Sequence, residues 1–90
     1  MAHTIRDKAK LLARVRRIQG QAIALEKELV KESDCVPILQ QIAAIRGAVN
    51  GLMAVVMEGH ITDHLVNEQK IQLRRRDVTA VLQVVRSYLK

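Results

Sequence analysis

Residues 38–53 read ILQQIAAIRGAVNGLM, and their pattern indicates a helical protein. Its apolar residues recur at steps of four and three, the spacing of a helix that buries one face against other helices. The pattern extends to Val56 and comprises Ile38, Ile42, Ile45, Val49, Leu52 and Val56. Between these positions lie small residues that let another helix approach closely, namely Ala43, Ala44, Gly47, Ala48 and Gly51. The stretch predicts a long helix over residues 35–66 that packs against other helices.

Two further helices are expected, one on each side of this long helix. Residues 4–31 carry an apolar seam with the same spacing, made of Leu11, Val15, Ile18, Ala22, Leu25 and Leu29. A polar stretch ends that helix, and Pro37 then falls in the first turn of the next one, where its missing N–H does no harm. A third helix is expected over residues 73–89, with its apolar face made of Val78, Val81, Leu82, Val85 and Leu89. The sequence therefore predicts an all-α fold, with three helices in one domain that spans residues 1–90.

Association between chains follows from the length of these apolar faces. A chain of 90 residues buries a modest fraction of its surface when it folds alone. Two long seams joined as a helical hairpin cannot cover their own apolar surface, whereas two such hairpins together form a four-helix bundle. We therefore expect a dimer built as an antiparallel four-helix bundle.

Composition narrows the class of partner and the compartment. The formal net charge of +6 indicates a polyanionic partner, either nucleic acid or an acidic membrane surface, and a solvated basic surface is the alternative. The single cysteine, Cys35, cannot form an intramolecular disulfide, which favours a reducing compartment. No signal-peptide pattern is expected at the N-terminus, and no uninterrupted apolar run approaches the roughly 20 residues of a membrane span. We expect a cytoplasmic protein that has no membrane partner.

Two histidines and the cysteine form a candidate metal site. His60 and His64 are four residues apart and therefore lie on one face of a helix. Cys35 precedes His60 by 25 positions, which is about 37 Å along a continuous helix. One chain cannot bring these residues together within that helix. An antiparallel pair of such helices, with its two-fold axis near Ala48, brings Cys35 of one protomer to the histidine pair of the other.

A thiolate combined with two or three imidazoles suits nickel, cobalt or zinc, and suits copper less well. His3 is a further nitrogen donor near the N-terminus, and the amine of Ala2 is another if Met1 is removed. Asp34 and Asp63 flank the site and can supply oxygen ligands or contacts to the ligands. The competing interpretation of Cys35 is a small buried apolar residue, and that of His3 is an ordinary terminal residue.

Basic residues mark a candidate DNA-binding face. Arg6, Lys10, Arg14 and Arg17 follow one another at steps of four, four and three, so they align along the first predicted helix, and Arg46 extends the set. Such a row of cations fits the phosphate backbone of double-stranded DNA. Because no helix-turn-helix or zinc-finger motif is visible, contacts would be mainly to the backbone and to DNA shape. The alternatives are a solvated face and a helical scaffold protein that never touches DNA. We find no acid–base pair or nucleophile typical of an enzyme.

Several stretches resemble the CsoR/RcnR family of small helical repressors. They are ILQQIAAIRGAVNGLM at residues 38–53, RVRRIQGQ at 14–21 and SYLK at 87–90. HTIRDK at residues 3–8 and EGHITDH at 58–64 most resemble the nickel- and cobalt-responsive RcnR branch. The resemblance covers essentially the whole chain.

This resemblance implies a tetramer formed as a dimer of dimers. It also implies a metal-free form that binds operator DNA and releases it when nickel or cobalt binds, which derepresses an efflux or detoxification gene. Inducer identity in the family follows four positions, which are His3, Cys35, His60 and His64 in this chain. Copper-responsive members carry a second cysteine where this chain has His64. The alternative within the family is a formaldehyde-responsive repressor that reacts through Cys35, and such members usually carry proline where this chain has Ala2.

Overall fold

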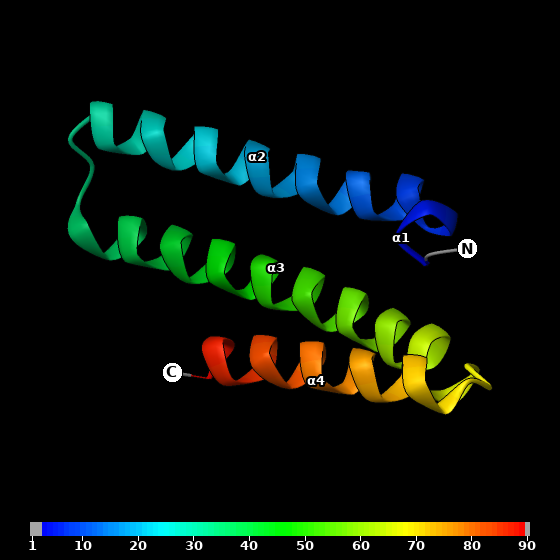
Figure 1. The fold of residues 1–90 in the computed structure, drawn as a ribbon. Helices are drawn as coiled ribbons and strands as arrows, with labels where there is room; N and C mark the ends of the chain where they lie inside the picture. Colours follow the sequence, from blue (N-terminus) through cyan, green and yellow to red (C-terminus); the bar gives the residue numbers. More distant parts are fainter. Residues whose placement is uncertain (1–2, 90) are drawn as a thin grey trace. The chain divides into compact units, whose positions relative to one another are not determined.

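The computed structural model describes residues 3–89 and is all-α in this range (Figure 1). It contains a one-turn helix α1 (His3–Arg6), the long helices α2 (Lys8–Val30) and α3 (Cys35–Ile61), a π-helical turn η1 (Thr62–Val66), and α4 (Ile71–Tyr88). The prediction of three main helices is confirmed. The tetramer and the bundle of two chains stay predictions, as does the assignment of residues 1–90 to one domain.

The helix boundaries differ from the prediction in the first and last helices, and the helix predicted over residues 35–66 is α-helical only to Ile61. The first predicted helix, over residues 4–31, is divided at Asp7, whose φ of −98° and ψ of 16° lie outside the regular helical range. Aspartate favours helix caps over helix interiors, and the Asp7 carbonyl accepts the first hydrogen bond of α2, from Leu11 N–H at 3.0 Å. The last helix begins at Ile71, two residues before the predicted start at Leu73.

The described chain divides into two compact units. The hairpin unit comprises residues 7–54, in which α2 and the greater part of α3 run antiparallel (Figure 1). The histidine unit comprises residues 3–6 and 55–89, and it holds α1, the last turns of α3, η1 and α4.

Within the hairpin unit, the half-buried positions differ from the predicted seams at every second step. They are Leu11, Ile18, Gln21, Leu25 and Glu28 of α2, and Ile38, Gln41, Ile45, Ala48, Gly51, Leu52 and Met53 of α3. The predicted seam residues Leu29 and Ile42 are instead 55% and 47% exposed. Apolar residues of α2 occupy more than one face, so their spacing alone does not determine which stripe contacts α3. The exposure of Leu29 and Ile42 agrees with the expectation that one hairpin cannot cover its own apolar seams.

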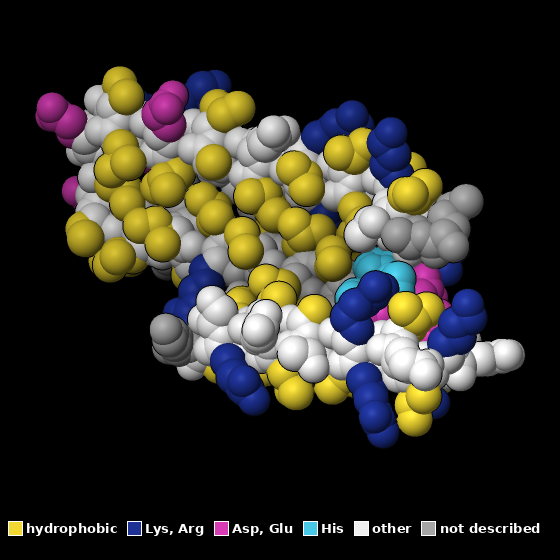
Figure 2. Space-filling model, viewed as in Figure 1, with side chains coloured by type: hydrophobic (Ala, Val, Ile, Leu, Met, Phe, Trp, Pro, Cys, Tyr) yellow, Lys and Arg dark blue, Asp and Glu magenta, His cyan; other side chains and the backbone are white. Residues whose placement is uncertain are grey.

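A continuous apolar surface results from this arrangement. Figure 2 shows hydrophobic side chains gathered over α2 and the part of α3 beside it. The exposed large apolar residues of the hairpin unit are Leu12, Val15, Ile23, Leu29, Val30, Val36, Leu39, Ile42 and Val49. No apolar side chain among residues 3–89 is fully buried. The hairpin unit thus leaves uncovered the kind of surface that helical proteins bury on association.

The turn between α2 and α3 is held by a helix-terminating motif. Glu32 adopts the left-handed conformation, with φ of 57°. The N–H of Glu32 donates to the Leu29 carbonyl at 3.1 Å, and that of Ser33 donates to the Glu28 carbonyl at 3.2 Å. This pair of bonds is the Schellman pattern, which satisfies the last carbonyls of a helix.

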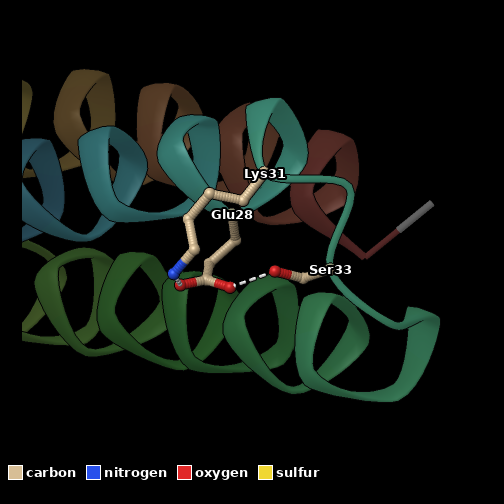
Figure 3. Close-up of polar contacts among 3 residues, drawn as sticks. All are labelled: Glu28, Lys31 and Ser33. Atoms are coloured by element: carbon tan, nitrogen blue, oxygen red, sulfur yellow. Dashed lines mark hydrogen bonds and ion pairs between the residues drawn. The ribbon is translucent and has the colours of Figure 1, made fainter.

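A side-chain cluster reinforces the same turn (Figure 3). The Ser33 hydroxyl donates to Oε2 of Glu28 at 2.5 Å, and Nζ of Lys31 lies 3.4 Å from Oε1 of Glu28. The hydrogen bond from Ser33, followed by the charge of Lys31, lowers the pKa of the Glu28 carboxyl from its ordinary value. The cluster therefore favours the ionised carboxylate.

In the histidine unit, α3 passes into a wider turn before the chain reverses into α4. The N–H of Asn67 donates to the Thr62 carbonyl at 3.0 Å, five residues earlier, which is the π-helical pattern. Helix α4 packs against η1, and its half-buried residues are Leu73, Asp77, Val81 and Val85. Three residues of its predicted apolar face, Val78, Leu82 and Leu89, are exposed instead.

The segment formed by α3 and η1 is strongly apolar. Residues 35–66 include an 18-residue window with a mean hydropathy of 1.3, so this segment is long and apolar enough to cross a membrane. The expectation concerned uninterrupted apolar runs, and polar residues such as Gln41, Arg46 and Glu58 do interrupt this segment. Length and composition alone do not separate such a span from the central helix of a water-soluble bundle, which meets the same criterion.

Candidate metal centre

Three imidazole rings meet in the histidine unit, although they come from three different elements. His3 lies in α1, His60 in the last turn of α3, and His64 in η1. The ring centroids of His60 and His64 are 4.7 Å apart, and the His3 centroid lies 6.2 Å from that of His60 and 5.8 Å from that of His64. Figure 2 shows the histidine side chains gathered in one place, with acidic side chains beside them. The three histidines that the sequence predicts as ligands therefore lie together within one chain.

His3 is enclosed to a degree unusual for a residue so near the N-terminus. It is 4% exposed, and its Nδ1 and Nε2 atoms both lack a hydrogen-bond partner. Nε2 of His60 is likewise buried and has no partner. Buried polar atoms without partners are costly, so a cluster of unpartnered imidazole nitrogens is expected to have a ligand.

These nitrogens fit a transition metal by chemistry and by spacing. Imidazole is a common ligand of zinc, nickel and related ions, and rings that share one ion at an N–metal distance of about 2.1 Å have centroids roughly 5 Å apart. The plane of the His3 ring is inclined by 86° to that of His60 and by 69° to that of His64. No group of three or more His, Cys, Asp or Glu side chains in residues 3–89 is arranged to hold a metal ion as it stands. Binding would therefore require the rings to rotate.

Two carboxylates, those of Asp63 and Asp77, lie beside the histidine cluster. Nη1 of Arg6 lies 3.0 Å from Oδ2 of Asp63, which links α1 to η1. The same oxygen forms no geometrically good hydrogen bond, so the contact is an ion pair defined by distance. Oδ2 of Asp77 lies 3.9 Å from Nδ1 of His64, which is too long for a hydrogen bond and becomes an ion pair only when the imidazole is protonated.

The remaining predicted ligand belongs to the hairpin unit. Cys35 is exposed and is the first residue of α3, whereas His60 is the next-to-last residue of the same helix. The alternative that Cys35 is a buried apolar residue does not hold for the single chain. Asp34 is exposed just before it, and the predicted Ala2 amine lies outside the described residues.

The basic residues predicted to contact DNA fall into both units. Lys10, Arg14 and Arg17 are exposed on α2, and Arg46 is exposed on α3. Arg14 and Arg17 also line a groove of about 610 Å³ within the hairpin unit, whose other walls are small residues of α3 such as Gly47 and Gly51. This groove combines positive charge with close access to the helix backbone.

Arg6 departs from the predicted row of cations. It was expected on the same continuous helix as the three cations of α2, but the break at Asp7 places it in α1, which belongs to the histidine unit. There it pairs with Asp63. The spacing that predicted one helical row across all four cations therefore applies only to those in α2.

Two residues of the site are not predicted from the sequence. Gly59 lies directly under the ring of His3, and Asp77 of α4 approaches His64. The sequence offers a signal for Gly59, since a glycine inside a helical pattern often marks a position where another segment approaches the helix closely. Asp77 had none, because its position relative to His64 depends on how α4 packs against η1.

The chain is similar to proteins that regulate transcription. A family model described as "Metal-sensitive transcriptional repressor" matches residues 7–87. The transcriptional repressor RcnR of Salmonella typhimurium (strain LT2) and that of Escherichia coli (strain HS) are each 54% identical over 90 residues, which covers 100% of both chains. A solved structure of a variant of the formaldehyde-responsive regulator FrmR from Salmonella enterica serovar Typhimurium, with a histidine in place of one glutamate, matches with a TM-score of 0.85. It is 45% identical and covers 92% of this chain and 94% of that chain.

Proposed function

The chain belongs to the metal-sensitive transcriptional repressor family and is an RcnR-type repressor rather than an enzyme, and from this premise we propose that nickel or cobalt is its inducer. In this proposal the metal-free protein binds operator DNA and releases it when the ion binds, which derepresses an efflux or detoxification gene. The observation that carries the proposal is the cluster of three imidazoles, in which buried nitrogens of His3 and His60 lack hydrogen-bond partners. Zinc is compatible with the same donors.

The ion would be held by His3, His60 and His64 of one protomer and by Cys35 of the partner subunit. The donor set supports this choice, because a thiolate with several imidazoles suits nickel and cobalt. The position of Cys35 supports a shared site, since this exposed residue and His60 stand at opposite ends of a helix of 27 residues. An antiparallel pair of α3 helices brings these two ends together. When bound, the ion would act as a crosslink between the protomers.

The partner subunit is supported by the apolar surface of the hairpin unit. Leu29 and Ile42 are about half exposed in the single chain, although burial of such side chains contributes roughly 1.5–3 kcal/mol each. A four-helix bundle of two hairpins covers this surface. Val78 and Leu82 of α4 are exposed as well, and they offer a second apolar face through which dimers would form the proposed tetramer.

DNA binding would rely on the cations of the hairpin unit. Lys10, Arg14, Arg17 and Arg46 are exposed and can neutralise phosphates. Arg6 belongs instead to the N-terminal arm, which we define as residues 3–6. In the structure Asp63 holds Arg6, and this pairing competes with any phosphate contact of the same guanidinium. Metal binding through His3 would stabilise this paired arrangement further and so weaken any contact of Arg6 with DNA, and linkage requires that DNA weaken metal binding equally.

A cytoplasmic location accords with this function. The relatives are bacterial transcriptional repressors, a function that implies DNA binding. The high apolarity of α3 is then explained by helix packing within the bundle.

Formaldehyde sensing is a second candidate function, favoured by the exposed thiol of Cys35 and by the likeness to a formaldehyde-responsive regulator.

The experiment that separates the two functions compares the release of operator DNA by nickel, cobalt and formaldehyde. We expect nickel or cobalt to release the wild-type protein, Cys35→Ala to bind DNA without metal-driven release, and His64→Ala to lose the metal response as well. If formaldehyde releases both the wild-type protein and His64→Ala while neither metal releases the wild type, the metal proposal is wrong.

A further inference from the structure

Gly59 occupies a helix position that does not require glycine for its backbone. It lies within α3, and no glycine among the described residues has a positive φ. Alanine is favoured over glycine in such a position because glycine loses more conformational freedom when the helix forms. The backbone conformation therefore does not explain why this position carries glycine.

The ring of His3 occupies the space that a side chain at position 59 would take. A Cβ atom built on Gly59 would lie 2.5 Å from Cδ2, 2.9 Å from Cγ and 3.2 Å from Nε2 of His3. A Cβ on Gly20 or Gly47 would meet nothing within 4 Å, and one on Gly51 would lie 3.4 Å from an arginine nitrogen. Of the four glycines, Gly59 is the one at which a methyl group and the observed neighbour cannot coexist.

The His3 ring seated on Gly59 is the most enclosed polar side chain that the structure describes. It is 4% exposed, and its two nitrogens have no hydrogen-bond partner. The rings of His60 and His64 lie beside it, with centroids 6.2 and 5.8 Å away. A ring held in this way is kept close to two other imidazoles.

We propose that Gly59 is a positioning residue that seats the His3 ring beside His60 and His64. The size of the side chain at position 59 then decides whether the N-terminal arm contributes to metal binding. The seating itself is a property of the metal-free protein, and only its effect on metal affinity rests on the proposed function. The chemical class of ligand is a divalent transition-metal ion that accepts several imidazole nitrogens.

The variant Gly59→Ala is suited to the test because it should fold. Alanine strengthens the helix, and the atoms that the new methyl group meets belong to a side chain of a one-turn helix rather than to the backbone of a packed element. The expected response is displacement of the His3 ring. Gly20→Ala is the matched control, since it makes the same change within a long helix where nothing lies within 4 Å.

The first experiment measures exposure of His3 in the metal-free, full-length protein. Each variant is treated briefly with diethyl pyrocarbonate, and modification of His3 is quantified by mass spectrometry. We expect His3 to be protected in the wild type and in Gly20→Ala, and to be modified at least several-fold faster in Gly59→Ala. Equal protection of His3 in Gly59→Ala and the wild type would overturn the proposal.

The second experiment measures cobalt affinity by competition with a chelator for Gly59→Ala, His3→Ala and the double variant. A residue that acts through a ligand typically changes metal affinity by about 10–100-fold, so we expect such a loss for Gly59→Ala. Because Gly59 acts through His3, the double variant should lose no more than His3→Ala alone. Additive losses would overturn the proposal. If the wild type binds no cobalt, the proposed function fails, and the exposure of His3 still decides the role of Gly59.

Discussion

Nη1 of Arg6 and Oδ2 of Asp63 lie 3.0 Å apart, and their contact ties α1 to the π-helical turn that carries His64. The Asp63 side chain is 14% exposed and that of Arg6 is 55% exposed, so the pair is only partly screened by solvent. His3 is in the same one-turn helix as Arg6. The N-terminal arm is thus fixed at two points, one through the His3 ring on Gly59 and one through this ion pair.

Loss of the ion pair should release the arm. In Asp63→Asn the charge attraction is removed, and a partly exposed ion pair contributes about 0.2–1 kcal/mol. We expect trypsin to cleave after Arg6 up to about five times faster than in the wild type, because cleavage follows the population of the open form. Asp34→Asn is the control, since Asp34 is exposed in the other unit. Unchanged cleavage after Arg6 in Asp63→Asn would show that the pair does not hold the arm.

A cation of α2 should contribute to DNA affinity in a salt-dependent way. If Lys10 neutralises one phosphate, Lys10→Ala lowers the magnitude of the slope of log K against log salt by about 0.9 per contact. Lys27→Ala changes the same residue type in the last turn of the same helix and should leave the slope unchanged. The slopes are obtained from operator binding measured by fluorescence anisotropy at several salt concentrations. Equal slopes for the two variants would contradict the assignment of Lys10 to the DNA-binding face.

The existence of the helices could be predicted because their apolar spacing is long and regular. It could not be predicted which side of each helix packs against the other helices of the same chain. In α2, Gln21 and Glu28 are half-buried where Ala22 and Leu29 were expected. The apolar residues cover more than one face, so choosing between neighbouring stripes requires knowledge of every surface that the assembled protein buries.

The histidine cluster could be predicted in part. The spacing of His60 and His64 places them on one face, and His3 could be proposed only as a nearby terminal donor. Its burial depends on the break at Asp7, which turns α1 back towards α3, and on the space above Gly59. Such a close approach between two distant segments has no periodic signature in the sequence.

The turn cluster predicts a specific pH dependence of stability. The pKa of Glu28 is lowered in the folded state, chiefly by the hydrogen bond from Ser33. The stabilisation is therefore complete above the unfolded-state pKa of Glu28 and is lost as the pH falls through the lower folded-state pKa. Ser33→Ala should lose less stability on acidification than the wild type, as measured by urea unfolding from neutral to acidic pH. Ser87→Ala, which changes an exposed serine of α4, should follow the wild type. Parallel pH profiles for all three proteins would contradict the role of Ser33.

The left-handed residue of the same turn offers a stabilising substitution. Glu32 has φ of 57°, a conformation that is unfavourable for residues with a side chain and available to glycine. We expect Glu32→Gly to raise the free energy of unfolding by about 0.5–1 kcal/mol, because the relief of strain exceeds the added entropy of the unfolded chain. Glu26→Gly, inside α2, should lower it by a similar amount. Urea unfolding at equal protein concentration measures both, and a destabilised Glu32→Gly would contradict the role given to this turn.

The central claim is that the metal site takes Cys35 from one protomer and His60 and His64 from the other. Its most direct test is a cobalt titration of purified mixed dimers that contain one Cys35→Ala chain and one chain with both His60→Ala and His64→Ala. Each homodimer lacks a complete site, whereas the mixed dimer regains one site if the ligands come from two chains. We predict one cobalt ion per mixed dimer, with the absorption of a cobalt–thiolate bond, and no such absorption in either homodimer. A mixed dimer that binds cobalt no better than the two homodimers would contradict the shared site.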